Sequence, residues 1–312
     1  MLSRTADSLF WLGRYTERAA NVARGLTVAG RMAGLGTSGE WRSLLIATGC
    51  DVGFFGKHAT AVQEFAADYL VRDRDNPSSI LSCFAAARAN ARMVRTALTV
   101  DMWGGLNDSW QQIRDVAEAD FQGEKLPGFL DWVRERVLLF NGAAQDTMLR
   151  GEAFHFVQLG TALERADNTA RLLDVKHELL EGGDTGTGEY AQWQAILQSV
   201  SALRAYHWVY RQGLEADRIA ELLILRPEMP RSLAACHGRV AEVLDAIAEG
   251  QGDRRGECHR RAHELRAMLR DSRVERLLEE GLHDFLTRMI VHTAELGGAI
   301  ERFYIQGDEA AP

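Results

Sequence analysis

Two stretches of the sequence carry the same acidic, amide and guanidinium side chains at the same spacing. Each stretch opens with Leu-Gly-x-x-x-Glu-Arg-Ala, and the second follows the first at a constant offset of 147 residues. Guanidinium groups bind carboxylates and phosphates through paired hydrogen bonds, and a carboxylate of shifted pKa can act as an acid or base. The candidate site therefore consists of the matched pairs Glu17 and Glu164, Arg18 and Arg165, Asn21 and Asn168, and Arg24 and Arg171.

The repeated residues would lie on two opposite faces of a helix. At 100° per residue, one face is a core stripe that consists of Leu12, Tyr15, Ala19, Val22 and Leu26. Glu17, Asn21 and Arg24 lie on the other face together with Gly13, which recurs as Gly160. A merely solvated face has no physical reason to repeat. Because glycine inside a helix costs about 1 kcal/mol against alanine, its presence at both positions predicts close approach of another backbone or a ligand.

Three interpretations of the polar face remain open. In the first, Glu17 and Glu164 are partly buried and pair with arginines, and the asparagines complete a structural network. In the second, the two helices meet near a pseudo-twofold axis and line one cleft that binds a carboxylate or phosphate ligand. In the third, Glu17 and Glu164 hold a metal ion.

The rest of the sequence offers a metal little support. Ferritin-like bundles need Glu-x-x-His on two helices and two further glutamates. Glu152-x-x-His155 fits that pattern, but its counterpart in the first stretch runs from Thr5 to Ser8. His259-x-x-x-His263 lies among arginines and is expected on a solvated basic face. The sequence therefore predicts no metal and no cofactor.

Further matches extend the repeat along the whole chain. Pro77-x-Ser79-Ile80-x-x-Cys83 matches Pro230-x-Ser232-Leu233-x-x-Cys236 at an offset of 153, so small loop insertions separate the blocks. We therefore expect two tandem copies, residues 1–147 and residues 148–312, packed as one compact unit. The two serines follow prolines at helix starts and are expected to form terminal hydrogen bonds.

The apolar periodicity predicts an all-α helical bundle with about five helices in each copy. In the first copy they are expected at 2–33, 41–71, 78–102, 106–121 and 127–147, with a break at Gly104-Gly105. In the second copy they are expected at 150–181, 190–226, 231–249, 254–271 and 274–305.

Composition excludes several classes of function. The 36 basic and 44 acidic residues give a net charge of −8, which argues against nucleic acid as a partner. No run of 18 apolar residues and no leader pattern occurs, so we expect neither a membrane span nor export. The four cysteines are widely spaced and are expected as reduced thiols in a cytoplasmic protein. A Gly-x-Ser-x-Gly nucleophile motif is missing.

The signature blocks resemble the bacterial alpha-E family of α-helical domains with a Glu-Arg motif. The resemblance rests on residues 2–19, on Leu163-Glu164-Arg165-Ala166, and on the segments that begin at Asn76 and Pro230. One departure is Thr161, where the first copy has Arg14, so a role that needs this arginine in both copies is in doubt.

The resemblance implies a protein of uncertain biochemical activity that is commonly encoded beside an ATP-grasp protein and a transglutaminase-like protease. We therefore expect an accessory helical protein that binds an ATP-grasp-type amide or peptide ligase, or its peptide substrate, through the surface that the Glu-Arg helices organise. A transglutaminase-like protein is a second expected partner. The alternative is an enzyme of the same pathway that uses Glu17 and Glu164, with flanking arginines, as an acid/base or anion-binding cleft.

Overall fold

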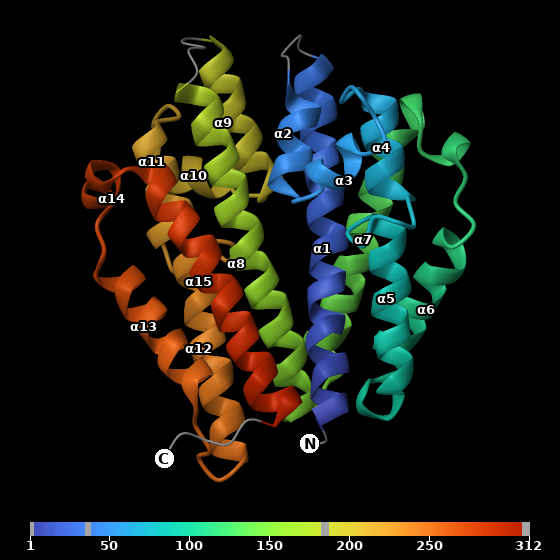
Figure 1. Cartoon of the computed structure of the whole chain (residues 1–312), viewed down its shortest axis with the longest axis vertical. Helices are drawn as coiled ribbons and strands as arrows, with labels where there is room; N and C mark the ends of the chain where they lie inside the picture. The colour runs from blue at the N-terminus through green and yellow to red at the C-terminus, as the bar shows by residue number, and fades with distance from the viewer. Residues whose placement is uncertain (1–2, 35–38, 182–186, 308–312) are drawn as a thin grey trace. The chain divides into compact units, whose positions relative to one another are not determined.

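A computed structural model describes residues 3–34, 39–181 and 187–307 of the chain (Figure 1). This part of the chain forms fifteen α-helices, several short 3₁₀ or π-helical turns and no β-strand. The all-α fold class is therefore confirmed.

The chain divides into two compact units. Unit 1 consists of residues 1–30 and 39–161, and unit 2 consists of residues 31–38 and 162–312. One division falls inside a long helix, after Thr161, whereas the two expected copies meet between residues 147 and 148. A compact unit and a sequence copy are thus different segments of this chain.

Unit 1 contains the long helix α1, Ser3–Gly34, as far as Gly30. Successive helices then pack on one another, α4 on α5, α5 on α6 and α6 on α7. The bounds are α2 Glu40–Ala47, α3 Asp51–Phe55, α4 Gln63–Val71, α5 Ile80–Met93, α6 Val100–Ile113 and α7 Leu126–Thr147, with 3₁₀ turns at Arg95–Ala97, Glu118–Asp120 and Gly123–Lys125.

The single helix expected over 41–71 is wrong, because this segment forms three helices. Gly49 adopts φ 66°, a left-handed conformation that ends α2. The amide of Cys50 then donates to the carbonyl oxygen of Leu45 at 2.8 Å, which satisfies a terminal carbonyl.

The expected break at Gly104-Gly105 is also wrong. Helix α6 begins at Val100, where the side chain of Thr99 accepts a hydrogen bond from the amide of Met102 at 3.3 Å. The helix then continues through both glycines to Ile113. An N-cap threonine and a buried apolar face thus outweigh a helix-weakening pair of glycines.

Unit 2 contains most of helix α8, Glu152–Glu181, and the helices that follow. Helix α13 packs on α12 and α15, and α14 packs on α11 and α15. The bounds are α9 Thr187–Ser199, α10 Leu203–Tyr210, α11 Ala216–Ala220, α12 Leu233–Gly250, α13 Glu257–Asp271, α14 Val274–Glu280 and α15 Leu282–Glu301, with π-helical turns η4 Glu221–Leu225 and η5 Arg302–Gln306.

Two long helices expected in unit 2 are divided in the structure. The segment 190–226 is interrupted at Ser201 and Arg211, which have φ 60° and 52°. The segment 274–305 is interrupted at Gly281, with φ 96°. In each case the backbone enters a conformation that an α-helix excludes, although the apolar periodicity continues on both sides.

The two repeated serines form the predicted terminal hydrogen bonds. Ser79 Oγ accepts from the amide of Ser82 at 3.2 Å, and Ser232 Oγ accepts from the amide of Ala235 at 3.0 Å. Each serine therefore caps the helix that follows it, α5 or α12, and the interpretation as a capping residue is confirmed.

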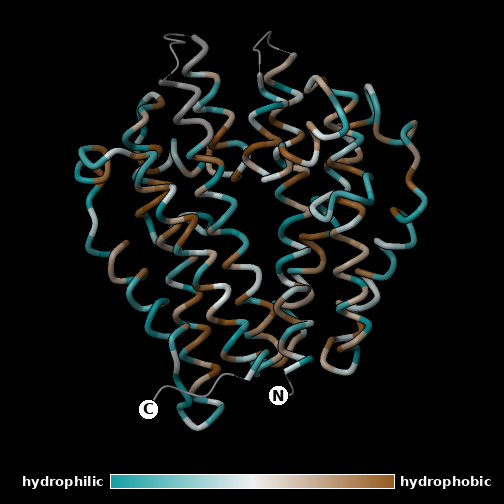
Figure 2. Tube along the Cα trace, in the orientation of Figure 1, coloured by the Kyte–Doolittle hydropathy of each residue, from teal (hydrophilic) through white to brown (hydrophobic). Residues whose placement is uncertain are grey.

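Apolar side chains fill the interior of each unit, and Figure 2 shows hydrophobic and hydrophilic segments alternating along single helices. All four cysteines are buried and free, which confirms the expected reduced thiols. None of the described helices combines the length and apolar character needed to cross a membrane.

A histidine is fully buried in the core of unit 2. His237 lies on α12, and its Nε2 is 3.3 Å from the hydroxyl of Thr293 on α15. That hydroxyl donates to the carbonyl oxygen of Met289 at 2.7 Å, so it can accept a hydrogen from Nε2. Burial, with a smaller contribution from the charge of His292, lowers the pKa of His237 to about 4.

We predict that His237 makes unit 2 sensitive to acid. Its pKa is about 4 when folded and about 6.5 when unfolded, so its stabilising contribution is complete above pH 6.5 and is lost as the pH falls towards 4. The loss should reach about 3 kcal/mol near pH 4. Urea unfolding across this pH range measures it. His237→Phe introduces the residue found at the equivalent buried position, Phe84, and should flatten the pH dependence. An equally steep profile in this variant would contradict the assignment.

Candidate functional site

The beginnings of the two signature helices cross within unit 1, and glycines lie at the contact. A Cβ atom on Gly13 of α1 would overlap the carbonyl oxygen of Val157 and lie 3.0 Å from the amide nitrogen of Thr161, both on α8. A Cβ atom on Gly160 would overlap the carbonyl oxygen of Phe10. The prediction that these glycines allow close backbone approach is therefore confirmed.

The contact is reciprocal. Gly13 lies against Val157 and Thr161, and Gly160 lies against Phe10 and Arg14. Val157 and Thr161 follow Phe10 and Arg14 at the same offset of 147 residues that relates Gly160 to Gly13. Thr161 lies at the contact, where its hydroxyl donates to Val157 O of the same helix at 2.9 Å and is 3.5 Å from Gly13 O. The crossing therefore relates matched positions of the two helices.

The glutamates of the signature are deeply buried. Glu17 is 1% exposed and Glu164 is 2% exposed, while Arg24 is 9% exposed. The polar face of α1 is thus an interior surface, in agreement with the argument that a solvated face would not repeat. A buried carboxylate persists only when it is paired or hydrogen-bonded, so this burial favours the structural interpretation of Glu17 and Glu164.

The remaining candidate residues are only partly buried. This group consists of Arg14, Arg18 and Asn21 on α1, and Arg165, Asn168 and Arg171 on α8. Arg171 Nε donates to Asp167 Oδ2 at 2.8 Å, one helical turn earlier, where the first copy has Ala20. Glu17 belongs to unit 1 and Glu164 to unit 2, and the single cleft lined by both stays a prediction of the sequence.

An alternating row of aromatic and cationic side chains runs along the partly exposed side of α1. We call Trp11, Arg14, Tyr15 and Arg18 the α1 ladder. The guanidinium carbon of Arg14 lies 4.8 Å from the Trp11 ring centroid, and that of Arg18 lies 5.7 Å from the Tyr15 ring. The two rings are 5.3 Å apart. Each cation–π contact contributes about 0.5–1 kcal/mol at such exposure, so the ladder is a preordered surface.

Sequence reasoning selected Arg14 and Arg18 but assigned Tyr15 to the core and left Trp11 out. The signal was the spacing i, i+3, i+4, i+7, which places all four side chains on one side of a helix. The second copy has Gln158, Thr161 and Ala162 at the first three equivalent positions, so the ladder belongs to the first copy alone.

The expected solvated position of His259 is wrong. This residue is 2% exposed, its Nδ1 accepts from the amide of Gly256 at 3.0 Å, and its Nε2 is 3.2 Å from the hydroxyl of Tyr304. His263 instead contacts Asp245 at 3.1 Å. The two histidines therefore have different structural partners. Among the described residues, no group of three or more His, Cys, Asp or Glu side chains is arranged to hold a metal ion.

The fold and the site define an all-helical protein whose Glu-Arg helices cross at paired glycines and bury their glutamates. The chain belongs to the Alpha-E family, described as a predicted α-helical domain with a conserved ER motif, which it matches over residues 1–305. Glu17-Arg18 and Glu164-Arg165 are the Glu-Arg pairs of the two signature blocks.

The chain is also similar to three uncharacterised mycobacterial proteins. It is 26% identical to one from Mycobacterium bovis and to one from Mycobacterium tuberculosis, and 25% identical to another from M. tuberculosis. The alignments cover 92% of this chain but 35% of each relative, so the chain spans about a third of their length. No solved structure matches the chain.

We predict that the glycine crossing tolerates no side chain. Gly13→Ala and Gly160→Ala should each lower the free energy of unfolding by about 3 kcal/mol or more, because the new methyl group would overlap backbone atoms that cannot move aside. Gly104 is the control, since it lies inside α6 with open space around its Cβ position. Gly104→Ala should increase stability by up to about 1 kcal/mol. Chemical denaturation compares the three variants, and equal effects would contradict the crossing.

A second prediction concerns the buried carboxylate. Glu17→Gln should lower the free energy of unfolding by about 3 kcal/mol, because it removes a charge to which the buried surroundings are adapted. Glu135 on α7 is exposed and provides the control, so Glu135→Gln should change stability by less than about 0.5 kcal/mol. An unchanged unfolding midpoint for Glu17→Gln would show that its carboxylate has no structural role.

Proposed function

We propose that this protein is an accessory helical module that binds an ATP-grasp-type amide or peptide ligase, or the peptide substrate of that ligase. The α1 ladder is the contact surface, and the buried polar residues of the Glu-Arg helix hold that surface in place. A transglutaminase-like protein is a second proposed partner, and the shared location would be the cytoplasm.

The observation that carries this proposal is the chemistry of the ladder. Aromatic residues and arginine are the side chains most enriched at the energetic centres of protein interfaces. The ladder combines both types on one rigid helix, and its contacts already restrict their rotamers. A partner would therefore lose little side-chain entropy on binding here.

The length of the relatives supports a role within a larger assembly. In the mycobacterial proteins, the region similar to this chain is joined to nearly twice its own length of further polypeptide. A covalent connection keeps two parts at high effective concentration, so even a surface of weak affinity can hold them together. We therefore expect the partner to correspond to part of that additional polypeptide.

The enzyme alternative receives less support. A general acid or base must reach the proton that it transfers, either directly or through one water molecule. Glu17 and Glu164 are 1% and 2% exposed, so neither carboxylate is open to a substrate in this conformation. Their burial suits a residue that positions a helix better than one that performs chemistry.

We also propose that the chain arose by tandem duplication. The reciprocal contacts of Gly13 and Gly160 support this origin, as do the matching caps formed by Ser79 and Ser232. Cys83 and Cys236 add a further match, because each sulfur lies close to the carbonyl oxygen of the residue six positions earlier, at 3.9 and 3.8 Å.

Co-purification of the full chain with the ATP-grasp-type ligase of the same organism tests the function. The intact protein should capture the ligase, and Trp11→Ala or Arg14→Glu should weaken the complex at least about tenfold, as expected for residues at the centre of an interface.

Another arginine and tryptophan pair in unit 1 supplies matched controls. The guanidinium of Arg95 lies 5.1 Å from the ring of Trp103, outside the ladder. Trp103→Ala and Arg95→Glu should leave capture unchanged. Failure of the intact chain to bind the ligase or its peptide substrate, or equal losses in both sets of variants, would overturn the proposal.

A further inference from the structure

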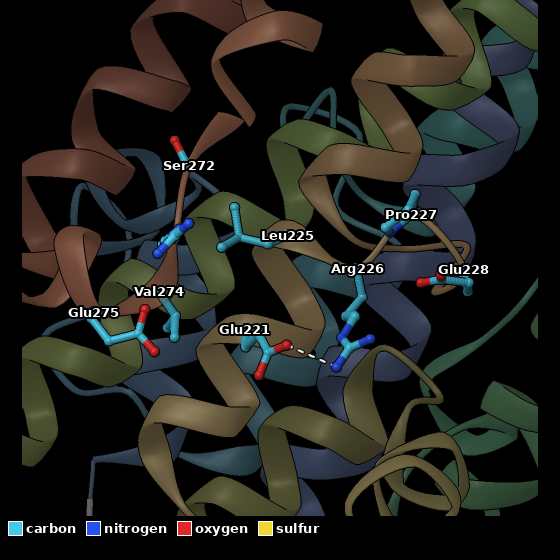
Figure 3. A pocket seen from close by; sticks show the side chains of 9 residues that line it. Glu221, Leu225, Arg226, Pro227, Glu228, Ser272, Val274 and Glu275 are labelled. Atoms are coloured by element: carbon cyan, nitrogen blue, oxygen red, sulfur yellow. Dashed lines mark ion pairs between the residues drawn. The ribbon is translucent and has the colours of Figure 1, made fainter. Parts of the chain in front are cut away.

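Unit 2 contains a pocket of about 430 Å³ between the π-helical turn η4 and the start of α14. This volume lies within the range of roughly 300–1,000 Å³ that is typical of sites for small organic ligands. Leu225 and Val274 provide apolar surface, and Figure 3 shows Val274 and Glu275 on one side with Glu221 and Leu225 facing them.

The π-helical turn arranges two of the charged residues. The amide of Arg226 donates to the carbonyl oxygen of Glu221 at 3.2 Å, which is a bond across five residues. In a regular α-helix, side chains five residues apart point about 140° away from each other. Here the wider turn brings Glu221 Oε1 to 2.9 Å from Arg226 Nη2 (Figure 3). Such turns are rare and occur frequently at functional sites.

Tyr210 packs beside the ion pair of Glu221 and Arg226. The guanidinium of Arg226 lies 5.9 Å from the Tyr210 ring centroid. Burial, together with the neighbouring carboxylate of Glu221, raises the pKa of Tyr210 to about 12. The tyrosine is neutral at physiological pH and adds no charge to the pocket. The charges of Glu221 and Arg226 therefore balance each other.

The other charged residues of the pocket are available to a ligand. Glu228, Arg273 and Glu275 are exposed, and within the described residues none of the three forms an ion pair. The pocket thus offers carboxylates and a guanidinium beside an apolar surface. A dianion such as phosphate would be repelled by the excess of carboxylates, and a simple cation would leave Arg273 without a partner.

We propose that this pocket binds a small zwitterion, namely an amino acid or a dipeptide. Glu275 receives the ammonium group, Arg273 receives the carboxylate, and an aliphatic side chain packs on Leu225 and Val274. Guanidinium and carboxylate form charge-assisted hydrogen bonds, so each end of the ligand has a complementary group. This site lies within unit 2 and does not depend on partner binding by the α1 ladder.

The equivalent segment of unit 1 has a different geometry. Asp68 and Arg72 form their ion pair across four residues, at the end of the regular helix α4. Arg72 also pairs with Glu118 at 3.2 Å. The segment in unit 1 therefore lacks the widened turn that forms one wall of the pocket in unit 2.

Calorimetric titration of the full chain with three related dipeptides tests the proposal. Leucyl-leucine carries both charges, its N-acetyl form lacks the ammonium group, and its C-terminal amide lacks the carboxylate. We expect leucyl-leucine to bind at least about tenfold more tightly than either capped form.

Variants connect each charge to its residue. Glu275→Gln should weaken binding of leucyl-leucine and remove the discrimination against the N-acetyl form. Arg273→Gln should weaken binding and remove the discrimination against the amide. Glu279→Gln changes an exposed glutamate of the same helix outside the pocket and should have no effect.

Three results would overturn the proposal: no binding of leucyl-leucine at millimolar concentration, equal binding of all three probes, or equal effects of Glu275→Gln and Glu279→Gln. Because Arg273 and Glu275 are exposed, the variants should retain the unfolding midpoint of the parent chain. Ligase capture measured on the same variants separates this site from the α1 ladder, since neither substitution lies on α1.

Discussion

The contact between helix backbones at Gly13 and Gly160 is the constraint on which unit 1 depends. A helix that carries side chains on every side keeps its neighbour about 8–10 Å away, whereas a missing Cβ atom allows closer approach. Here both helices lack a Cβ atom where the partner backbone arrives. The position and direction of α1 relative to the start of α8 are therefore fixed by backbone atoms, which cannot adapt as side chains can.

Beyond the crossing, α1 is buried on two of its sides. Leu12 and Leu26 are fully buried on one side, and Glu17 and Arg24 are buried on the other. A charged group inside a protein requires compensating partners at defined positions, so it restricts the helix to one rotation and one register. The α1 ladder lies on the side that stays partly exposed. A fixed helix with one accessible row of aromatic and cationic groups is well suited to recognition, because the binding surface is ordered before a partner arrives.

Sequence reasoning succeeded where one residue type had one physical explanation. Two glycines at matched positions inside helices implied close backbone approach, and serines after prolines implied helix caps.

Sequence reasoning failed where competing local signals had to be weighed. Gly104-Gly105 resembles a helix break, but the cap at Thr99 and the buried residues Met102 and Leu106 maintain the helix. The π-helical turn at Glu221–Leu225 was not predicted, because the hydrophobic periodicity of a sequence does not distinguish one widened turn from a regular α-helix. His259 was misplaced because arginine-rich neighbours do not show which side of a helix faces the core, and His259 is buried whereas the adjacent Arg260 is exposed.

The proposed duplication also explains where the two halves of the chain differ. Several matched residues that remain identical contact backbone or cap helices, such as Gly13 and Gly160 or Ser79 and Ser232. Substitution of either glycine would disturb a contact that both helices share. Other positions have changed, so that Trp11 and Arg14 correspond to Gln158 and Thr161. Phe84 likewise corresponds to His237, and the regular helix that contains Asp68 corresponds to the wider turn that begins at Glu221. A common scaffold would then carry a recognition surface in one unit and a ligand pocket in the other. Two identical halves could provide only two copies of one site, and divergence between the halves allows two different ones.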